Sequence, residues 1–252
     1  MIANRRARRA AIARGQSWLR FTTSTTPPKL RRSLLRGASG MALAIAIGAA
    51  SPALAVDECG VVGAGGTATC TPAGNNFPGG IQYQVVDLTI VVQDGVIIDT
   101  TGVGGEPGGI VSGGAGNYGD LVVKAGTGGG AGVTITTDGN DAEGVFVQSK
   151  DGGATITFFG QVTTGGTGAE GLFASGYAAS ISATGAITTQ GADSAAISGT
   201  TTGFSALSIT STGKLSTQGN NSDGIHAEGS NYGAVVVSTG DISTKGTSSE
   251  GI

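Results

Sequence analysis

The residues that could do chemistry in this chain are few, and the histidine is the first to consider. His226 is the single histidine among 252 residues, and Ser222 and Asp223 stand a few positions before it. A serine, a histidine and an aspartate are the components of a nucleophilic triad. Here the three lie within five residues, on one expected strand and its turn, where their side chains diverge. We therefore predict that His226 is a surface residue and that the cluster is not catalytic.

Acidic residues recur at one position of a sequence repeat, each directly before a glycine and an aliphatic residue. The row consists of Glu143, Glu170, Asp223 and Glu250. Carboxylates stacked at strand spacing could bind Ca²⁺, a hard ion that prefers oxygen ligands. Ala195 interrupts the row, which favours a solvated turn over an ion site. We expect no catalytic, cofactor-binding or metal-binding residue, with Ca²⁺ as the alternative at this row.

Aromatic residues also recur. Tyr118, Tyr177 and Tyr232 each lie four residues before an apolar position of an expected strand, and Phe204 lies near the equivalent place. An outward row of rings could contact a glycan or the surface of a partner protein. Stacked surface aromatics could equally stabilise the strand ladder itself. Both interpretations stay open, and we favour the structural one.

The elements that would position these residues are the copies of a repeat of 25–28 residues. Each copy holds an aliphatic anchor, a threonine two positions later, a glycine four positions later and a second aliphatic residue ten positions later. The anchors are Ile135, Val162, Ile187, Leu215 and Ile242. The second set is Val145, Leu172, Ile197, Ile225 and Ile252. A third set, six positions before the next anchor, is Ile156, Ile181, Ile209 and Val236.

This repeat predicts an all-β fold, a right-handed parallel β-helix with three short strands per coil over residues 96–252. Each copy has three β-branched stretches separated by Gly, Asn and Asp, and no stretch has a helical period. A propeller blade would need about 40 residues or more. We expect each aliphatic set to form an inward column. We also expect the recurring threonine to point inward in a hydroxyl ladder, and the corner glycines to supply positive φ.

The charge distribution separates the first 55 residues from the rest. Residues 1–55 hold ten of the fourteen basic residues and no acidic one, so residues 56–252 carry a net charge of −13. The apolar run Met41–Ala50 and the small residues Ala53 and Ala55 predict a secretory signal peptide cleaved after Ala55. Arg31 and Arg32 resemble a twin-arginine signal, although the general secretory route is favoured. Either route exports the chain.

The two cysteines follow this segment directly. Cys59 and Cys70 are the only cysteines, and an isolated pair in an exported chain predicts a disulfide. We assign residues 56–95 to an N-terminal cap that contains this bond, because terminal coils of solenoids are atypical. The repeat stops in mid-coil at Ile252, which we interpret as the N-terminal piece of a longer protein.

The long signal peptide, the Cys-bearing segment and the Gly-x-Ile-Thr-Thr-x-Gly coils ending in Glu/Asp-Gly-Ile together resemble an autotransporter passenger domain of a Gram-negative bacterium. The resemblance implies passage through the periplasm, an outer-membrane β-barrel as partner and display at the cell surface or outside it. The repeats, the low content of charged residues and the missing catalytic set favour a non-catalytic structural or adhesive stalk, with a glycan or protein ligand and no nucleic acid. The alternatives are a β-helical polysaccharide hydrolase or lyase, and a scaffold for a domain beyond residue 252.

Overall fold

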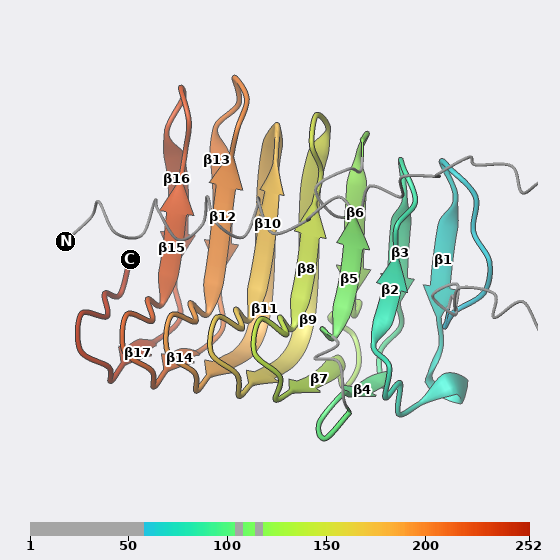
Figure 1. Cartoon of the computed structure of the whole chain (residues 1–252), viewed down its shortest axis with the longest axis horizontal. Coiled ribbons are helices and arrows are strands. Elements are labelled where there is room, and N and C mark those ends of the chain that lie inside the picture. Colours follow the sequence, from blue (N-terminus) through green and yellow to red (C-terminus); the bar gives the residue numbers. More distant parts are fainter. Residues whose placement is uncertain (1–57, 104–107, 114–117) are drawn as a thin grey trace, which may run out of the picture. The chain divides into compact units, whose positions relative to one another are not determined.

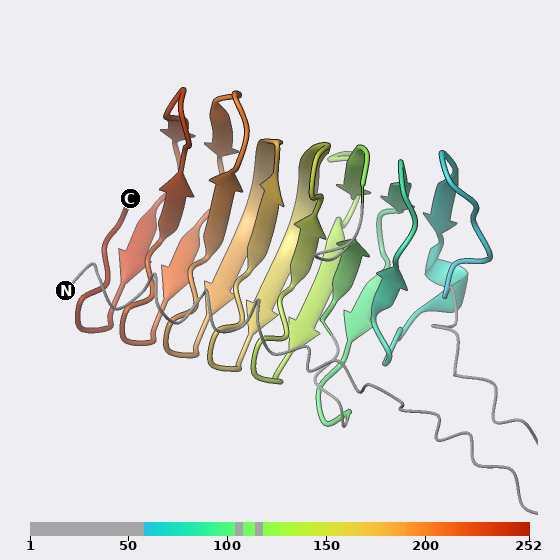
Figure 2. The same ribbon diagram turned by 45° about the horizontal axis from the view of Figure 1, so that its top comes forward.

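A computed structural model describes residues 58–103, 108–113 and 118–252 of the chain. It confirms the parallel β-helix: all strand pairs are parallel, and successive coils lie side by side in chain order (Figures 1 and 2). Among the described residues the one helix is a short 3₁₀ turn, η1 (Pro72–Gly74), and none is long and apolar enough to cross a bilayer. The predicted signal peptide, with Ala53 and Ala55, lies outside the described residues.

Each coil contributes strands to three columns, which we call faces A, B and C. Face A consists of β1 (Thr67–Cys70), β3 (Thr89–Val92), β6 (Leu121–Ala125), the first halves of β9 (Gly153–Thr164) and β11 (Ala178–Thr189), β13 (Leu207–Ser211) and β16 (Ala234–Ser238). Face B consists of β2 (Ile81–Tyr83), β5 (Ile110–Gly113), β8 (Val145–Gln148), β10 (Leu172–Gly176), β12 (Ile197–Thr201) and β15 (Ile225–Glu228). Face C consists of β4 (Ile97–Asp99), β7 (Val133–Thr137), the second halves of β9 and β11, β14 (Leu215–Thr217) and β17 (Ile242–Thr244).

The aliphatic sets lie in register inside the coils, with the exception of Ile252, which was expected to point inward and is 64% exposed. Ile187 pairs with Val162 on one side and with Leu215 on the other, and Leu172 pairs with Val145 and Ile197. The remaining neighbours in these columns pair as Ile135 with Val162, Leu215 with Ile242 and Ile197 with Ile225. Strand alternation turns every second residue inward, so the interior fills with side chains that are nearly all shielded from water. Each coil thereby covers the apolar edge of its neighbour.

The columns continue upstream of the regular repeat. Ile98 pairs with Ile135 on face C, and Ile81 pairs with Ile110 on face B. On face A the ladder reaches Ala68, which pairs with Ile90. Strands β1 to β3 therefore stack in the common register, although they lie in the segment 56–95 that we expected to form the cap.

The recurring threonine points inward, but the expected hydroxyl ladder is wrong. Each hydroxyl donates a hydrogen bond to a backbone carbonyl five residues later in its own coil, across the turn from face C to face B. The pairs are Thr137 to Ala142, Thr164 to Ala169, Thr189 to Ser194 and Thr217 to Ser222, at 2.6–2.7 Å. A hydroxyl has one hydrogen to donate, and in each of these coils it is used on the carbonyl of the turn.

The expected positive φ occurs at some corner glycines: Gly160 and Gly185, each two positions before an anchor, have φ of 149° and 124°. The glycines in the turn from face C to face B serve another purpose. The glycine four positions after each anchor has no positive φ. A β-carbon on Gly166 would clash with the carbonyl oxygen of Gly139 one coil earlier, and Gly191, Gly219 and Gly246 repeat this relationship. Positive φ falls two residues later, on Asp141, Gly168, Asp193, Asn221 and Ser248. Glycine is therefore required four positions after each anchor because successive backbones approach closely there. The positions of positive φ two residues later tolerate Asp and Asn.

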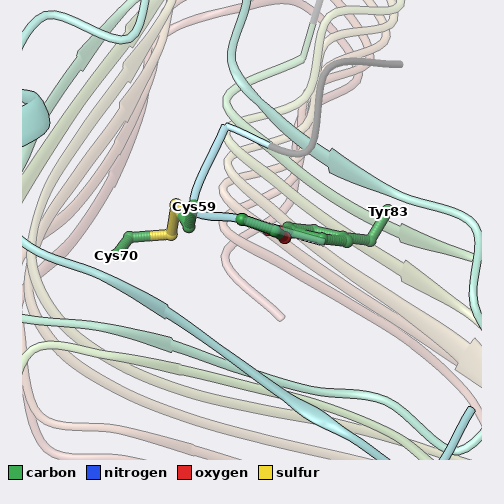
Figure 3. Close-up of a disulfide and its surroundings, with 4 residues drawn as sticks. Cys59, Cys70 and Tyr83 are labelled. Atoms are coloured by element: carbon green, nitrogen blue, oxygen red, sulfur yellow. A yellow bond between two sulfur atoms is a disulfide. The ribbon is translucent and has the colours of Figure 1, made fainter. Parts of the chain in front are cut away.

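The N-terminal end of the described solenoid is held by the disulfide between Cys59 and Cys70, whose Cα atoms lie 4.9 Å apart (Figure 3). Cys70 ends β1 and is buried. The buried ring of Tyr83 on β2 donates its hydroxyl to the carbonyl of Gly60 at 2.9 Å. The segment before β1 is thus fixed to two faces of the first coil.

Candidate functional site

The outer surface of face B carries His226 together with three residues of the preceding coils. Phe146, Phe173, Ser198 and His226 occupy the same outward register position on β8, β10, β12 and β15, and we call these four residues the outer strip. The rings of Phe146 and Phe173 stack with centroids 5.1 Å apart and planes 10° from parallel. Strands one coil apart are about 4.8 Å apart, so ring stacking follows directly from the register.

His226 ends the outer strip between two carboxylates. Its Nδ1 lies 3.4 Å from Asp223 Oδ2, and its Nε2 lies 3.4 Å from Glu228 Oε1. Asp223 comes from the turn before β15 and Glu228 from the end of the same strand. A protonated imidazole would be held from both sides, because each ring nitrogen then carries a donor.

Ser222 has a structural task that separates it from His226. Its hydroxyl is buried, donates to the carbonyl of Gly191 at 3.0 Å and accepts the N–H of Ser194 at 3.1 Å. Both partners belong to the preceding coil. A nucleophilic serine would instead need its hydroxyl bound to the imidazole. Ser222 thus connects two successive coils. The geometry of a Ser222–His226–Asp223 triad is absent from the described residues.

The acidic row borders the outer strip in the turns before β8, β10 and β15, and Glu250 occupies the equivalent position after β17. Backbone bonds place its members in register: the N–H of Gly144 donates to the carbonyl of Glu170, and the N–H of Gly224 donates to the carbonyl of Glu250. Burial raises the pKa of Glu143 to about 8, and the charges of Glu170 and Asp141 act in the same direction. Within the described ranges no three His, Cys, Asp or Glu residues are placed to hold a metal ion. Ca²⁺ at this row stays a prediction.

Acids elsewhere accept hydrogen bonds from the backbone, which the sequence analysis did not foresee. Asp120 accepts the N–H of Gly153 at 2.7 Å, and its own N–H donates to Asp87 at 3.0 Å. Further bonds of this kind run from Thr127 to Asp94, from Gly102 to Asp138 and from Gly119 to Asp151. Each connects residues in different coils. The signal available in the sequence was the recurrence of Asp beside Gly at turns.

The three tyrosines lie at the corners between faces B and A and are partly exposed, at 47% for Tyr118, 41% for Tyr177 and 66% for Tyr232. They do not stack on one another in the described part of the chain. Tyr118 instead accepts a hydrogen bond from Lys150 Nζ at 3.1 Å, and this contact raises the pKa of Lys150. The ring of Tyr177 covers Gly203, where a β-carbon would collide with it.

Comparisons of this chain with protein-family models, with curated proteins and with solved structures find no match.

Proposed function

We propose that this chain is the β-helical stalk of an exported surface protein, built to hold a partner or a further domain at a distance rather than to catalyse a reaction. The observation that carries the proposal is the unbroken register of the three columns. On face A, pairing runs from β1 through β3, β6, β9, β11 and β13 to β16. A stack in which each coil is fixed to its neighbours is a stiff spacer.

The hydrogen bonds that acidic side chains accept from the backbone also support a structural function. A polysaccharide hydrolase needs two carboxylates that face one scissile bond. Several acids of this chain instead hold backbone N–H groups of other coils, as Asp120 holds Gly153 and Asp138 holds Gly102. We therefore favour the stalk over the hydrolase or lyase.

Export and display complete the proposal. The basic segment, the apolar run Met41–Ala50 and the Ala53-x-Ala55 site suggest passage into the periplasm, where the bond between Cys59 and Cys70 would form. By its resemblance to autotransporter passengers, the chain would reach the cell surface with an outer-membrane β-barrel as partner. A glycan or a protein on another surface would be its adhesive ligand. With a net charge of −13 after residue 55, nucleic acid would be repelled.

A display experiment tests this function. An epitope is inserted after Val56 and an outer-membrane β-barrel is fused after Ile252, and the fusion is expressed in a Gram-negative host. We expect antibody labelling of intact cells, and loss of labelling when charged residues replace Ala44 and Ile45 in the apolar run. Retention of the intact chain's epitope in the cytoplasm would contradict the proposal. Turnover of a polysaccharide that one acid-to-amide change abolishes would overturn the non-catalytic assignment.

A further inference from the structure

The exposed aromatic side chains gather along one edge of the solenoid. Within the described ranges the exposed rings are those of Tyr118, Tyr177, Phe204 and Tyr232, each with 41–68% of its surface accessible. All of them lie in turns that lead from a face B strand to the following face A strand. No two of them stack on one another in that part of the chain. The idea that they stabilise the strand ladder by stacking therefore lacks the contact it needs.

Tyr177, Phe204 and Tyr232 come from three successive coils, and we call these three residues the aromatic corner. Their coils are adjacent because β11 pairs with β13, and β13 pairs with β16. Each coil rises by about 4.8 Å. The three rings are therefore spread along the solenoid axis, one to a coil, on the same edge of the molecule.

Tyr118 stands apart from this group. The N–H of Tyr177 donates to the carbonyl of Gly152 at 2.9 Å, and Gly152 belongs to the coil between the two tyrosines. Lys150 Nζ lies 4.9 Å from the centroid of the Tyr118 ring and donates to its hydroxyl. The ring of Tyr118 is therefore already engaged by a cation. It serves as a natural comparison for the aromatic corner.

Tyr177 is held against the backbone of the next coil. A β-carbon at Gly203 would lie 2.4–2.6 Å from Cγ, Cδ2 and Cε2 of the Tyr177 ring. Three ring atoms at nearly equal distance place the flat side of the ring over the glycine, which has no side chain to push it away. The ring is thus packed on protein and still 41% exposed. A ring held in this way loses little conformational entropy when a ligand binds.

The surroundings of the aromatic corner are polar and uncharged. The turns that carry Phe204 and Tyr232, residues 202–206 and 229–233, contain no charged residue and hold two serines, a threonine and an asparagine. Asn231 is exposed beside Tyr232, and its amide can both donate and accept hydrogen bonds. Such a surface matches a ligand that presents apolar faces and hydroxyl groups together and carries no charge.

A pyranose ring with equatorial hydroxyls has these properties. Both of its faces are C–H surfaces, which pack on aromatic rings by dispersion and weak C–H contacts, while its hydroxyls at the rim exchange hydrogen bonds with amides. A β-1,4-linked chain of such sugars is extended, and one sugar is close in length to one coil rise of about 4.8 Å. Nucleic acid bases also stack on rings, but their binding needs a basic groove, which these turns do not supply.

We propose that the aromatic corner binds a neutral β-1,4-linked glycan, whose chain runs along the solenoid axis with successive sugars on Tyr177, Phe204 and Tyr232. The inference rests on the proposed adhesive function and names its ligand. A protein is the competing occupant, because Val235 and Val237 on β16 extend the exposed apolar surface onto face A. The uncharged polar turns around the rings favour the sugar.

The test is isothermal titration calorimetry of the purified full chain with cellohexaose and with chitohexaose, both neutral β-1,4-linked glycans. We expect saturable binding of at least one of them, and weaker binding of maltohexaose, whose α-1,4 linkages curve the chain. Phe204→Ala and Tyr232→Ala should each weaken the binding about fivefold. Tyr118→Ala removes an exposed ring from the same edge and should leave the affinity within about twofold.

Absence of saturable binding of both glycans would overturn the proposal, as would an equal loss in Tyr118→Ala. Val237→Thr tests the competing occupant, since Thr210 occupies the paired position one coil earlier. A loss as large as that of Tyr232→Ala would indicate a broad apolar surface for a protein instead. Phe204→Ala and Tyr232→Ala should also keep the parent's midpoint of urea unfolding, and a marked fall would show that the rings are structural.

The display experiment separates this inference from the stalk function, because display of the epitope-tagged fusion on cells requires no sugar binding. Successful display without glycan binding would reject the ligand alone. Glycan binding by a chain that is not displayed would reject the surface function and leave the binding site in place.

Discussion

Thr189 Oγ1 lies 2.7 Å from the carbonyl oxygen of Ser194, and both residues are completely buried. The bond closes the turn between faces C and B from the inside. Its equivalents in other coils join Thr137, Thr164 and Thr217 to the same turn. The threonine repeats because the turn leaves one carbonyl inside the coil, where water cannot satisfy it.

Thr189→Val should therefore destabilise the fold. Valine keeps the shape and leaves the Ser194 carbonyl buried without its donor, at a cost of about 1–3 kcal/mol. The midpoint of urea unfolding measures the loss. The control is Thr188→Val, the next residue on the same strand, which faces outward and should change stability by less than about 0.5 kcal/mol. Equal effects at the two positions would contradict the assigned bond.

Gly166→Ala should be far more damaging than an ordinary glycine substitution. Its β-carbon would occupy the space of the Gly139 carbonyl oxygen, so two coils would have to separate. We expect a loss on the order of 3 kcal/mol or more, or failure to fold. Gly129→Ala is the matched control, because its β-carbon would meet only Thr127 Oγ1 at 3.9 Å. Thermal unfolding followed by circular dichroism compares the two, and similar melting temperatures would argue against close approach.

The sequence predicted what depends on alternation and period, and missed what depends on turn geometry. Inward columns such as Ile187 over Leu215 follow from β-branched residues at constant spacing. The register of the coils before Ile135 was not predicted, because Ile98 pairs with Ile135 across 37 residues, well above the regular period. Extra residues between strands change the spacing without changing the stack. The hydrogen-bond partner of Thr189 could not be predicted either, because it depends on which carbonyl the turn directs inward.

On the candidate site, the sequence predicted that His226 faces outward, and the structure places it on the outer strip in register with Ser198. The sequence could not show that Asp223 reaches His226, because side-chain contacts across a corner depend on the angle between faces. Nor could it show that the Ser222 hydroxyl donates its hydrogen bond to the carbonyl of Gly191, a residue one coil away.

Stability should fall as the pH rises from about 4.5 to about 8, because of Glu143. Its pKa is raised from 4.5 in the unfolded chain to about 8 in the fold, so the folded state binds a proton that the unfolded state releases. This contribution is complete below the unfolded pKa and is lost as the pH passes through the folded pKa. Urea midpoints measured across this range test it.

Glu143→Gln should flatten that pH dependence and make the chain more stable than the parent at high pH. Asp94 should have the opposite effect on the pH dependence of stability. Hydrogen bonds from the hydroxyl and the N–H of Thr127 lower the pKa of Asp94. Its contribution to stability is therefore lost only in acid, below about pH 4. A variant that keeps the parent's slope between pH 5 and 8 would show that another group titrates there.

Removing the disulfide should loosen one end of the solenoid. Cys59→Ser with Cys70→Ser opens the link between the first segment and β1, at a cost of about 2–3 kcal/mol. Because each coil contacts only its neighbours, amide hydrogen exchange should accelerate in β1, β2 and β3. Strand β11 serves as the internal control, and its amides should exchange as before. Uniform acceleration along the chain would indicate that the coils unfold together.

The backbone contact between Gly166 and Gly139 also limits how such a chain can change its length. A part-coil insertion within a strand would bring a side chain to a place where only hydrogen fits, whereas a whole added copy would recreate every contact at both of its junctions. Tandem duplication of one repeat therefore lengthens the molecule without redesigning it. Evolution, or an engineer, can adjust its reach in fixed steps of about 4.8 Å.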